Sequence, residues 1–380
     1  MLSSFGQLPS RVKVGSKYVG EGEPTFFIAE VGNNHNGDYY LAKKTIEESV
    51  RAGADAVKLQ KRFIGETFAR ELLERPQTKD QIYGKTYGEY RMALELNQEE
   101  FENLKKFSEQ LGVVFFATPF DKKSVDFLEE VGVDVYKIAS FDVTNIPLLE
   151  YVAQKGKPMF LSTGAATIDE LDEAVTAILK YNNQLMINHC VSIYPTPDEK
   201  LNLATIPFLK ERYKPLPIGY SGHEHDYLPT LAAVAMGAKM VERHITLDKA
   251  MPGPDHATVS IEPEEFQAMV ASTRRLEKAW GLPVKQLTDE ELQTRNKHGK
   301  SVVATHPIAA GTIITAEMLT CKSPGYGLKP NMLGQLVGKF ARVDITGDAV
   351  IKREDIVWPD AVPTQPVPGI IMDHRVGGQV

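Results

Sequence analysis

The first part of the chain alternates between short apolar runs and longer segments in which apolar residues recur every three or four positions. Short runs predict buried strands, and the longer pattern predicts amphipathic helices. Strands are predicted at Phe26–Val31, Ala56–Gln60, Val113–Thr118, Val135–Ser140, Pro158–Thr163, Leu185–Cys190, Pro217–Ser221 and Met240–Ile245. Helices are predicted at Tyr40–Ala52, Gln98–Gln110, Lys122–Val131, Thr167–Lys180 and Tyr227–Met236.

This alternation predicts an α/β fold. Eight strands alternating with helices over about 250 residues indicate a (β/α)8 TIM barrel, here residues 1–280. An open doubly wound sheet is the alternative, but no G-x-G-x-x-G follows the first strand. Residues 281–300 are polar and predict a linker with some helix, whereas residues 301–360 have short β-like runs that predict a small β-rich domain. Residues 361–380 form a tail rich in Pro and Gly.

The small domain contains a weak internal repeat. Residues 313–319 (IITAEML) resemble residues 350–356 (VIKREDI), and a glycine turn precedes each, at Gly311 and Gly347. Two similar units in one small domain predict internal two-fold character.

Composition and charge exclude several classes of protein. The net charge of -7 argues against a nucleic-acid partner, and 42% hydrophobic residues are typical of globular proteins. No apolar run approaches the roughly 20 residues that span a bilayer, and residues 1–17 lack the apolar core of a signal peptide. Cys190 and Cys321 form no metal or disulfide spacing. We therefore expect a cytoplasmic protein with no membrane partner.

Polar residues interrupt several of the apolar strands. Glu30 ends the first strand and precedes a Gly-containing loop, where α/β enzymes place catalytic groups. Lys58 and Gln60 lie on one side of the second strand, and Lys137 interrupts the fourth. A buried lysine is costly without an anion, so the two lysines predict one anion site. The alternative for each is an outward side chain that reaches solvent at the end of its strand.

Histidines at the last two strands indicate a metal site. His223 follows the seventh strand, and Glu242 and His244 lie on the same side of the eighth. Adjacent strands would bring both imidazoles to one cation, such as Mn, Zn, Fe or Co. A structural role is the alternative for either histidine.

Other polar groups lie in loops after the strands. Ser162 and Ser221 sit beside Gly-containing turns that offer donors to phosphate. Asp255 is a candidate for binding sugar hydroxyls, with an Asx turn as the alternative. The charged segment 71–95, which includes Arg91, is either part of the site or a surface excursion.

The motifs and their order along the chain resemble those of the sialic acid synthase (N-acetylneuraminate synthase) family, the phosphoenolpyruvate-dependent nonulosonate synthases. The stretches that carry the resemblance are Ala29–Gly37, Lys137–Ser140, Leu161–Gly164, His189–Pro195, Gly219–His223, Glu242–His244 and Gly253–His256. The end of the chain resembles the antifreeze-like (SAF) domain that follows the barrel in this family. The resemblance implies that phosphoenolpyruvate condenses with an N-acylated amino-sugar aldehyde, such as N-acetylmannosamine, giving a sialic acid-type nonulosonate and phosphate.

The resemblance also implies a role for each matching residue. The expected catalytic residues are Glu30, Lys58, Lys137 and Asp142. Substrate binding is expected of Gln60, Ser140, Ser162, Ser192, Tyr194, Ser221 and Asp255. His223 and His244 are expected to bind a divalent metal, commonly Mn, with Mg, Co or Zn as alternatives. Family members form a domain-swapped homodimer in which the SAF domain of one subunit caps the barrel of the other.

The chain departs from the family pattern at several positions. It has Asp142 where Glu is common, and Gly222 and Glu224 flank His223 where Asp and Thr are common. Ser192 replaces an Asn, and Ser323 stands where many members have the Arg that reaches the sugar's acyl group. These changes leave the acceptor open between N-acetylmannosamine and a 2,4-diacetamido-trideoxyhexose, which would give legionaminate or pseudaminate.

Three other functions are alternatives to this one. An octulosonate or heptulosonate synthase takes a phosphorylated sugar and needs an extra basic site, but the SAF-like domain argues against it. A metal-dependent barrel hydrolase often has His-x-His on its first strand, which is absent here. A non-catalytic carbohydrate-binding protein would not require both lysines and both histidines.

Overall fold

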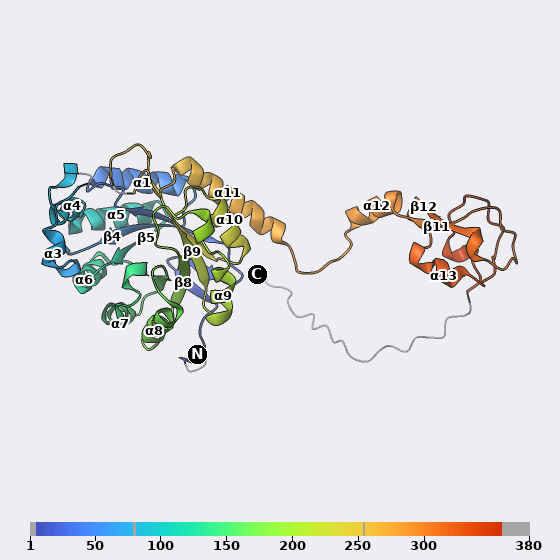
Figure 1. The fold of residues 1–380 in the computed structure, drawn as a ribbon, viewed down its shortest axis with the longest axis horizontal. Coiled ribbons are helices and arrows are strands. Elements are labelled where there is room, and N and C mark those ends of the chain that lie inside the picture. The colour runs from blue at the N-terminus through green and yellow to red at the C-terminus, as the bar shows by residue number, and fades with distance from the viewer. Residues whose placement is uncertain (1–4, 79–80, 254, 359–380) are drawn as a thin grey trace. The chain divides into compact units, whose positions relative to one another are not determined.

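The structure is a computed structural model that describes residues 5–78, 81–253 and 255–358. It divides into two units, Met1–Gly281 and Leu282–Val380, coloured from blue to light orange and from orange to red in Figure 1. The segment 281–300, expected to be a linker, contains helix α12 (Asp289–His298), which has no buried residue. The tail expected at 361–380 lies outside the described residues.

The first unit is a closed barrel of eight parallel strands, in the order β10-β3-β4-β5-β6-β7-β8-β9. The strands are β3 (Phe26–Gly32), β4 (Ala56–Lys61), β5 (Val114–Pro119), β6 (Tyr136–Ile138), β7 (Met159–Ser162), β8 (Leu185–Cys190), β9 (Ile218–Gly222) and β10 (Met240–His244). Closure pairs the last strand with the first, so that His244 lies opposite Glu30. The predicted TIM barrel is confirmed, and each strand lies where the apolar runs indicated.

Helices surround the barrel (Figure 1). They are α1 (Tyr39–Arg51), α5 (Gln98–Gln110), α6 (Lys122–Val131), α7 (Ile146–Ala153), α8 (Ile168–Leu179), α9 (Thr205–Arg212), α10 (Leu228–Ala235) and α11 (Pro263–Trp280). Their starts follow local chemistry: Asn97 and Thr167 form capping boxes with the Glu three residues later. The amphipathic pattern did not predict α7, α9 or α11. No helix in the described part of the chain is long and apolar enough to cross a bilayer.

The lower lumen of the barrel is filled by aromatic rings. Phe26 of β3 and Phe116 of β5 both lie against Phe160 of β7, with ring centroids 6.4 and 5.7 Å apart. These rings come from alternate strands, which is how TIM barrels build the layers of their core. On β3, Glu30 follows Phe26 by four residues and so lies nearer the carboxyl end of the strand than this ring.

A short hairpin precedes the barrel and was not predicted. Strands β1 (Arg11–Val14) and β2 (Lys17–Gly20) pair antiparallel, and their valines are buried in the barrel's core cluster. Gly15, in the turn, faces the side chain of Val114 at the start of β5. The hairpin thus lies at the amino end of the barrel, opposite the end where TIM barrels place their sites.

The second unit is small and rich in β-structure. Strands β11 (Ser301–Ala304) and β12 (Leu319–Lys322) pair antiparallel, and isolated bridges tie in the rest of the chain. The two copies of the repeat adopt the same form, because each ends in a 3-10 turn, at Ala316–Met318 and Arg353–Asp355. The equivalent residues Ile314 and Ile351 are both fully buried in one core. The repeat is therefore structural.

Candidate active site

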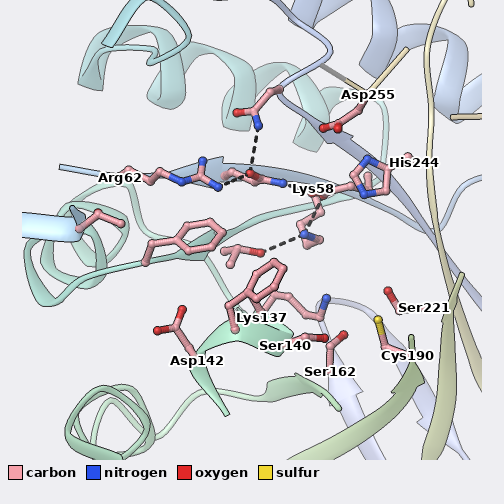
Figure 2. A pocket seen from close by; sticks show the side chains of 18 of the residues that line it. Lys58, Arg62, Lys137, Ser140, Asp142, Ser162, Cys190, Ser221, His244 and Asp255 are labelled. Carbon is pink, nitrogen blue, oxygen red and sulfur yellow. Dashed lines mark hydrogen bonds and ion pairs between the residues drawn. The ribbon is translucent and has the colours of Figure 1, made fainter. Parts of the chain in front are cut away.

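A cavity of about 580 Å³ opens at the carboxyl ends of the barrel strands (Figure 2). Every expected site residue except Ser192 lines it: Glu30, Lys58, Gln60, Lys137, Ser140, Asp142, Ser162, Tyr194, Ser221, His223, His244 and Asp255. Ser192 lines a neighbouring cavity between the loops that follow β7 and β8. The fold thus brings together residues that are more than 200 positions apart in the sequence.

The period of two along each strand places the charged groups in the lumen. On β10, Glu242 and His244 face inward together, and on β4 Lys58 and Gln60 do the same; all four line the cavity. The register sets their heights, because Glu30 lies opposite both Lys58 and His244 on the neighbouring strands. The alternation that was visible in the sequence therefore determines the composition of the site.

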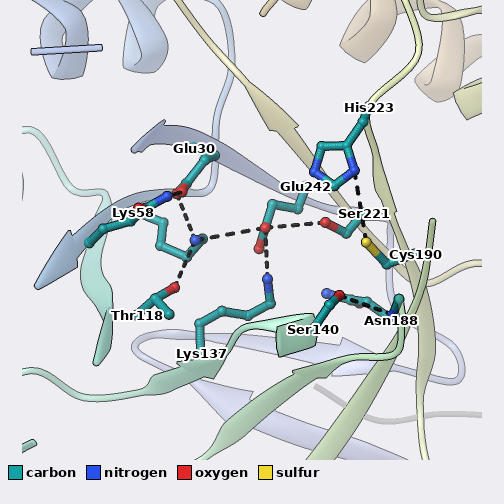
Figure 3. Close-up of polar contacts among 12 residues, drawn as sticks. Glu30, Lys58, Thr118, Lys137, Ser140, Asn188, Cys190, Ser221, His223 and Glu242 are labelled. Carbon is teal, nitrogen blue, oxygen red and sulfur yellow. Dashed lines mark hydrogen bonds and ion pairs between the residues drawn. The ribbon is translucent and has the colours of Figure 1, made fainter. Parts of the chain in front are cut away.

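Two buried lysines and two buried carboxylates form one network at the floor of the cavity (Figure 3). The Nζ of Lys58 lies 2.7 Å from Glu30 Oε2 and 3.8 Å from Glu242 Oε1. The Nζ of Lys137 donates to Glu242 Oε1 at 2.8 Å. The anion that each lysine requires is thus provided by the protein itself. Glu242, which pairs with both lysines, was not among the predicted site residues.

The two carboxylates differ in their titration. Burial raises the pKa of Glu30, and the charge of Lys58 only partly opposes this. Burial acts on Glu242 in the same direction, but Lys137 and Lys58 outweigh it and hold its pKa at about 2. Glu242 is therefore the fixed counter-ion, and Glu30 is the carboxylate that accepts a proton more readily.

A chain of hydrogen bonds extends from Glu30 toward the rim. Glu30 Oε1 accepts from Gln60 Nε2 at 2.7 Å. Gln60 Oε1 in turn accepts from Arg62 Nη2 at 2.6 Å and from Asn33 Nδ2 at 3.3 Å. These bonds fix the orientation of the Gln60 amide beside the Glu30 carboxylate.

The two histidines lie at the other side of the cavity, with ring centroids 5.5 Å apart. His223 Nδ1 lies 3.0 Å from the Val191 carbonyl, so that Nε2 remains available to a ligand. The Nδ1 of His244 is buried and has no hydrogen-bond partner among the described residues. Burial lowers the pKa of His244 to about 3, which keeps its imidazole neutral and able to bind a metal.

These two imidazoles fit a shared divalent ion, but they are not a complete ligand set. Among the described residues, no group of three or more His, Cys, Asp or Glu side chains is placed to hold a metal. An ion here would therefore take its other ligands from water and from substrate oxygens. Tyr194 packs over His223, with ring centroids 4.1 Å apart, and limits the space on that side.

A fully buried ion pair holds the two histidine-bearing strand ends together. Arg243, next to His244, donates to Glu224 Oε1 at 2.9 Å and to the Glu224 carbonyl at 2.6 Å. Glu224 also accepts from Tyr220 and Thr230. A Cβ on Gly222 would lie only 2.4 Å from the Glu224 carboxylate. The two departures on either side of His223 are thus coupled, because the glycine makes room for the glutamate.

The hydroxyls and Asp142 complete the wall. Ser221 Oγ donates to Glu242 at 3.2 Å, and Ser140 Oγ accepts from the Gly164 amide at 3.0 Å. The Oγ of Ser162 is buried and has no hydrogen-bond partner in the described part of the chain. Asp142 accepts from Asn145 Nδ2 at 2.9 Å, and burial raises its pKa. Ser162 is therefore a donor that is available to a ligand.

The charged excursion after β4 takes part in the cavity. It contains α3 (Arg70–Leu73), a 3-10 turn (Gln81–Tyr83) and α4 (Tyr87–Ala93). Tyr87 and Arg91 of α4 line the cavity together with Arg62, which directly follows β4. Of the two interpretations of segment 71–95, the structure supports the one that makes it part of the site. Arg62 was not predicted, because its position after the strand carries no distinguishing pattern.

Comparisons with known proteins agree with this geometry. The model of the NeuB family matches residues 45–285, and the SAF domain model matches residues 299–357. The N-acetylneuraminate-9-phosphate synthase of Homo sapiens is 41% identical over 339 residues, which cover 89% of this chain and 94% of that protein. The N,N'-diacetyllegionaminic acid synthase of Legionella pneumophila is 34% identical, over 90% of this chain and 97% of its own length.

A solved structure shows the same architecture. The N-acetylneuraminic acid synthetase of Leptospira borgpetersenii, solved in complex with citrate, superposes with a TM-score of 0.68 at 35% identity. The match covers 77% of this chain and 98% of that one. With a family model over most of the barrel and relatives aligned over nearly their whole length, this chain belongs to the NeuB family of sialic acid synthases and carries a SAF domain.

Proposed function

We propose that the protein condenses phosphoenolpyruvate with the open-chain aldehyde of an N-acylated amino sugar, giving a nonulosonate and phosphate. The observation that carries this proposal is the arrangement of Lys58 and Lys137 beside a carboxylate with a raised pKa, Glu30, and a pair of imidazoles. Relatives that are aligned over most of this chain are synthases of sialic, legionaminic and pseudaminic acids.

The lysines bind the anionic groups of phosphoenolpyruvate. In the structure both lysines contact Glu242. When phosphoenolpyruvate binds, its phosphate and carboxylate groups accept hydrogen bonds that the lysines otherwise donate to Glu242. The Ser162 and Ser221 hydroxyls add O–H donors from β7 and β9. Donors that are already fixed in a buried site stabilise charge more than they would in water.

Glu30 moves the proton. The enol carbon of phosphoenolpyruvate attacks the aldehyde carbon, and the aldehyde oxygen takes up a proton as it becomes a hydroxyl. Water then adds to the cationic carbon that bears the phosphate ester and loses a proton, and phosphate leaves the resulting tetrahedral centre. Burial raises the pKa of Glu30, which makes this carboxylate a better proton acceptor than an exposed one. Asp142, whose pKa is also raised, is the second candidate.

His223 and His244 would hold the divalent metal, with Mn as the expected ion. When bound, such an ion would supply Lewis acid chemistry at the aldehyde oxygen. The neutral imidazole of His244 and the free Nε2 of His223 support this assignment. Gln60 and Asp255 line the same cavity and would orient the sugar hydroxyls.

The proposal includes a homodimer in which the SAF domain of one subunit covers the barrel of its partner. Apolar side chains that are exposed in the second unit support it: Leu282, Val284 and Leu287 near its start, and Ile313 and Phe340 further along. Light scattering on the full chain would give twice the monomer mass. A cytoplasmic location is supported by the two free thiols, Cys190 and Cys321.

The experiment that tests the function is phosphate release from phosphoenolpyruvate with Mn and a panel of amino sugars. We expect release with N-acetylmannosamine, its phosphorylated form or a 2,4-diacetamido-trideoxyhexose, and a product heavier than the sugar. Lys137→Ala and His223→Ala should each abolish release while the circular dichroism spectrum is unchanged. Sugar binding without phosphate release from any acceptor would indicate the alternative, a non-catalytic carbohydrate-binding protein.

A further inference from the structure

Two arginines line the end of the cavity that lies away from the histidines. Arg62 follows β4 and is 6% exposed, and Arg91 comes from α4 in the excursion. Figure 2 places Arg62 on the opposite side of Lys58 from His244. The cavity therefore has a cationic end in addition to the lysine pair on its floor.

Neither guanidinium has a carboxylate partner within ion-pair distance in the described part of the chain. Arg62 donates to Gln60 and lies over the ring of Phe120 at 3.7 Å. Arg91 donates through Nε to the Tyr87 hydroxyl at 2.9 Å and packs near aromatic rings of the excursion. These contacts fix the planes of the guanidinium groups, and the carboxylates Glu95, Glu30 and Asp142 act on Arg62 only from beyond ion-pair distance.

The carboxylates that line the cavity are engaged elsewhere. Glu30 and Glu242 pair with the floor lysines. Glu66 pairs with Lys123 outside the cavity. Asp142 accepts from Asn145 and interacts with Arg62 only from beyond ion-pair distance, and Asp255 lies on the histidine side in Figure 2.

One more carboxylate, Glu95, lies close to Arg62 without lining the cavity. It accepts from Lys61 Nζ at 2.9 Å and from the Arg62 backbone N–H at 3.2 Å, and the Arg62 guanidinium is not in contact with it. Burial, and then the charge of Arg91, lowers the pKa of Arg62 to about 10. Two neighbouring cations of this kind are unfavourable unless an anion joins them, so this end of the cavity is built for an anionic group.

We propose that Arg62 and Arg91 bind the phosphate of a terminally phosphorylated amino sugar, so that the acceptor is an N-acyl hexosamine 6-phosphate. This inference rests on the proposed function, because it places the aldehyde beside the histidines and the far end of the same sugar at the arginines. Phosphoenolpyruvate has its own cationic partners in Lys58 and Lys137. Guanidinium groups bind phosphate oxygens through paired N–H donors, which a neutral hydroxymethyl group would leave unsatisfied.

The chemistry fixes the product. Condensation adds three carbons before the aldehyde carbon, so that C6 of the acceptor becomes C9 of the nonulosonate. The phosphate at the arginines is not transferred, and only the phosphate of phosphoenolpyruvate is released. The product would therefore be a nonulosonate 9-phosphate, which a separate phosphatase reaction must convert to the free acid.

Steady-state kinetics with two acceptors tests the inference. We expect kcat/KM for N-acetylmannosamine 6-phosphate to exceed that for N-acetylmannosamine by at least about a hundredfold. Arg91→Gln and Arg62→Gln should each remove roughly tenfold to a hundredfold of this preference, as expected for a lost hydrogen bond to a charged group. The loss should appear in KM for the sugar phosphate, with KM for phosphoenolpyruvate within about twofold of wild type, and Arg91→Lys should recover part of it.

Arg70→Gln is the matched control, because it removes the same charge from an exposed site in the same excursion. It should leave the preference unchanged. Equal use of both sugars by the wild type, or a rise in KM for phosphoenolpyruvate alone in both variants, would overturn the inference. Calorimetric titration of the full-length protein with each sugar distinguishes failure of this inference from failure of the proposed function. If no acceptor releases phosphate, the function fails, while tighter binding of the phosphorylated sugar that depends on Arg91 would still support the anion site.

Discussion

Removing Glu242 tests whether the floor of the cavity is a balanced charge network. Glu242 Oε1 contacts Lys137 Nζ at 2.8 Å, Ser221 Oγ at 3.2 Å and Lys58 Nζ at 3.8 Å. Glu242→Gln keeps the shape and removes the charge, leaving Lys137 buried with no carboxylate in contact. Breaking a buried ion pair in this way costs about 3–5 kcal/mol.

This loss is measured as a lower free energy of unfolding of the barrel, from urea unfolding followed by circular dichroism. Because the penalty comes from the lysine charge, Glu242→Gln combined with Lys137→Met should recover most of the lost stability. Inorganic phosphate should also stabilise Glu242→Gln more than wild type, because an anion can replace the missing carboxylate. If Glu242→Gln unfolds at the wild-type urea concentration and does not respond to phosphate, the lysines do not depend on Glu242 and the reasoning fails.

Three further predictions follow from the site and its supports. His223→Ala should lower the Mn bound per chain, measured by elemental analysis, with an unchanged circular dichroism spectrum; equal Mn content would contradict the ligand assignment. Gly222→Asp should destabilise the barrel, and adding Glu224→Thr should restore most of the loss, because the clash is with the Glu224 carboxylate; additive losses would refute the coupling. Hydrogen bonding, first from the Arg212 guanidinium on α9, lowers the pKa of Asp172. The carboxylate's contribution to folding stability is therefore full above pH ~4 and disappears as pH falls through the lowered pKa. Asp172→Asn should thus lower the free energy of unfolding in urea by about 1–2 kcal/mol at pH 7 and by little at pH 2. An equal loss of stability at both pH values would contradict a stabilising role for the ionised carboxylate.

The barrel and the depth of its polar residues could be predicted from the sequence because both depend on local periodicity. The end of the first apolar run singled out Glu30, the period of two put Lys58 and Gln60 on one side of the second strand, and the structure puts Glu30 and Lys58 in contact. The N-terminal hairpin carries the same signal, in Arg11-Val12-Lys13-Val14, but its strands of four residues are short. Helices α7 and α9 are only eight residues long, which leaves little pattern to recognise.

Contacts across the lumen could not be predicted in this way. The sequence placed Glu242 on the same side of its strand as His244, but its pairing with Lys137 joins strands on opposite parts of the barrel and depends on how the barrel closes. Arg62 could not be identified either, because a charged residue in a loop is usually solvated, and for Arg91 the sequence left open whether segment 71–95 belongs to the site. Only the fold shows that both line one cavity without a carboxylate partner among the described residues.

The most direct test of the central claim is the stoichiometry of the reaction with phosphoenolpyruvate, Mn and a hexosamine acceptor. Phosphate is measured colorimetrically and the sugar product by mass spectrometry. We predict one phosphate released for each new product molecule, whose mass equals that of the acceptor plus the elements of pyruvic acid. Release of pyruvate in equal amount to phosphate, with the sugar unchanged, would contradict the account.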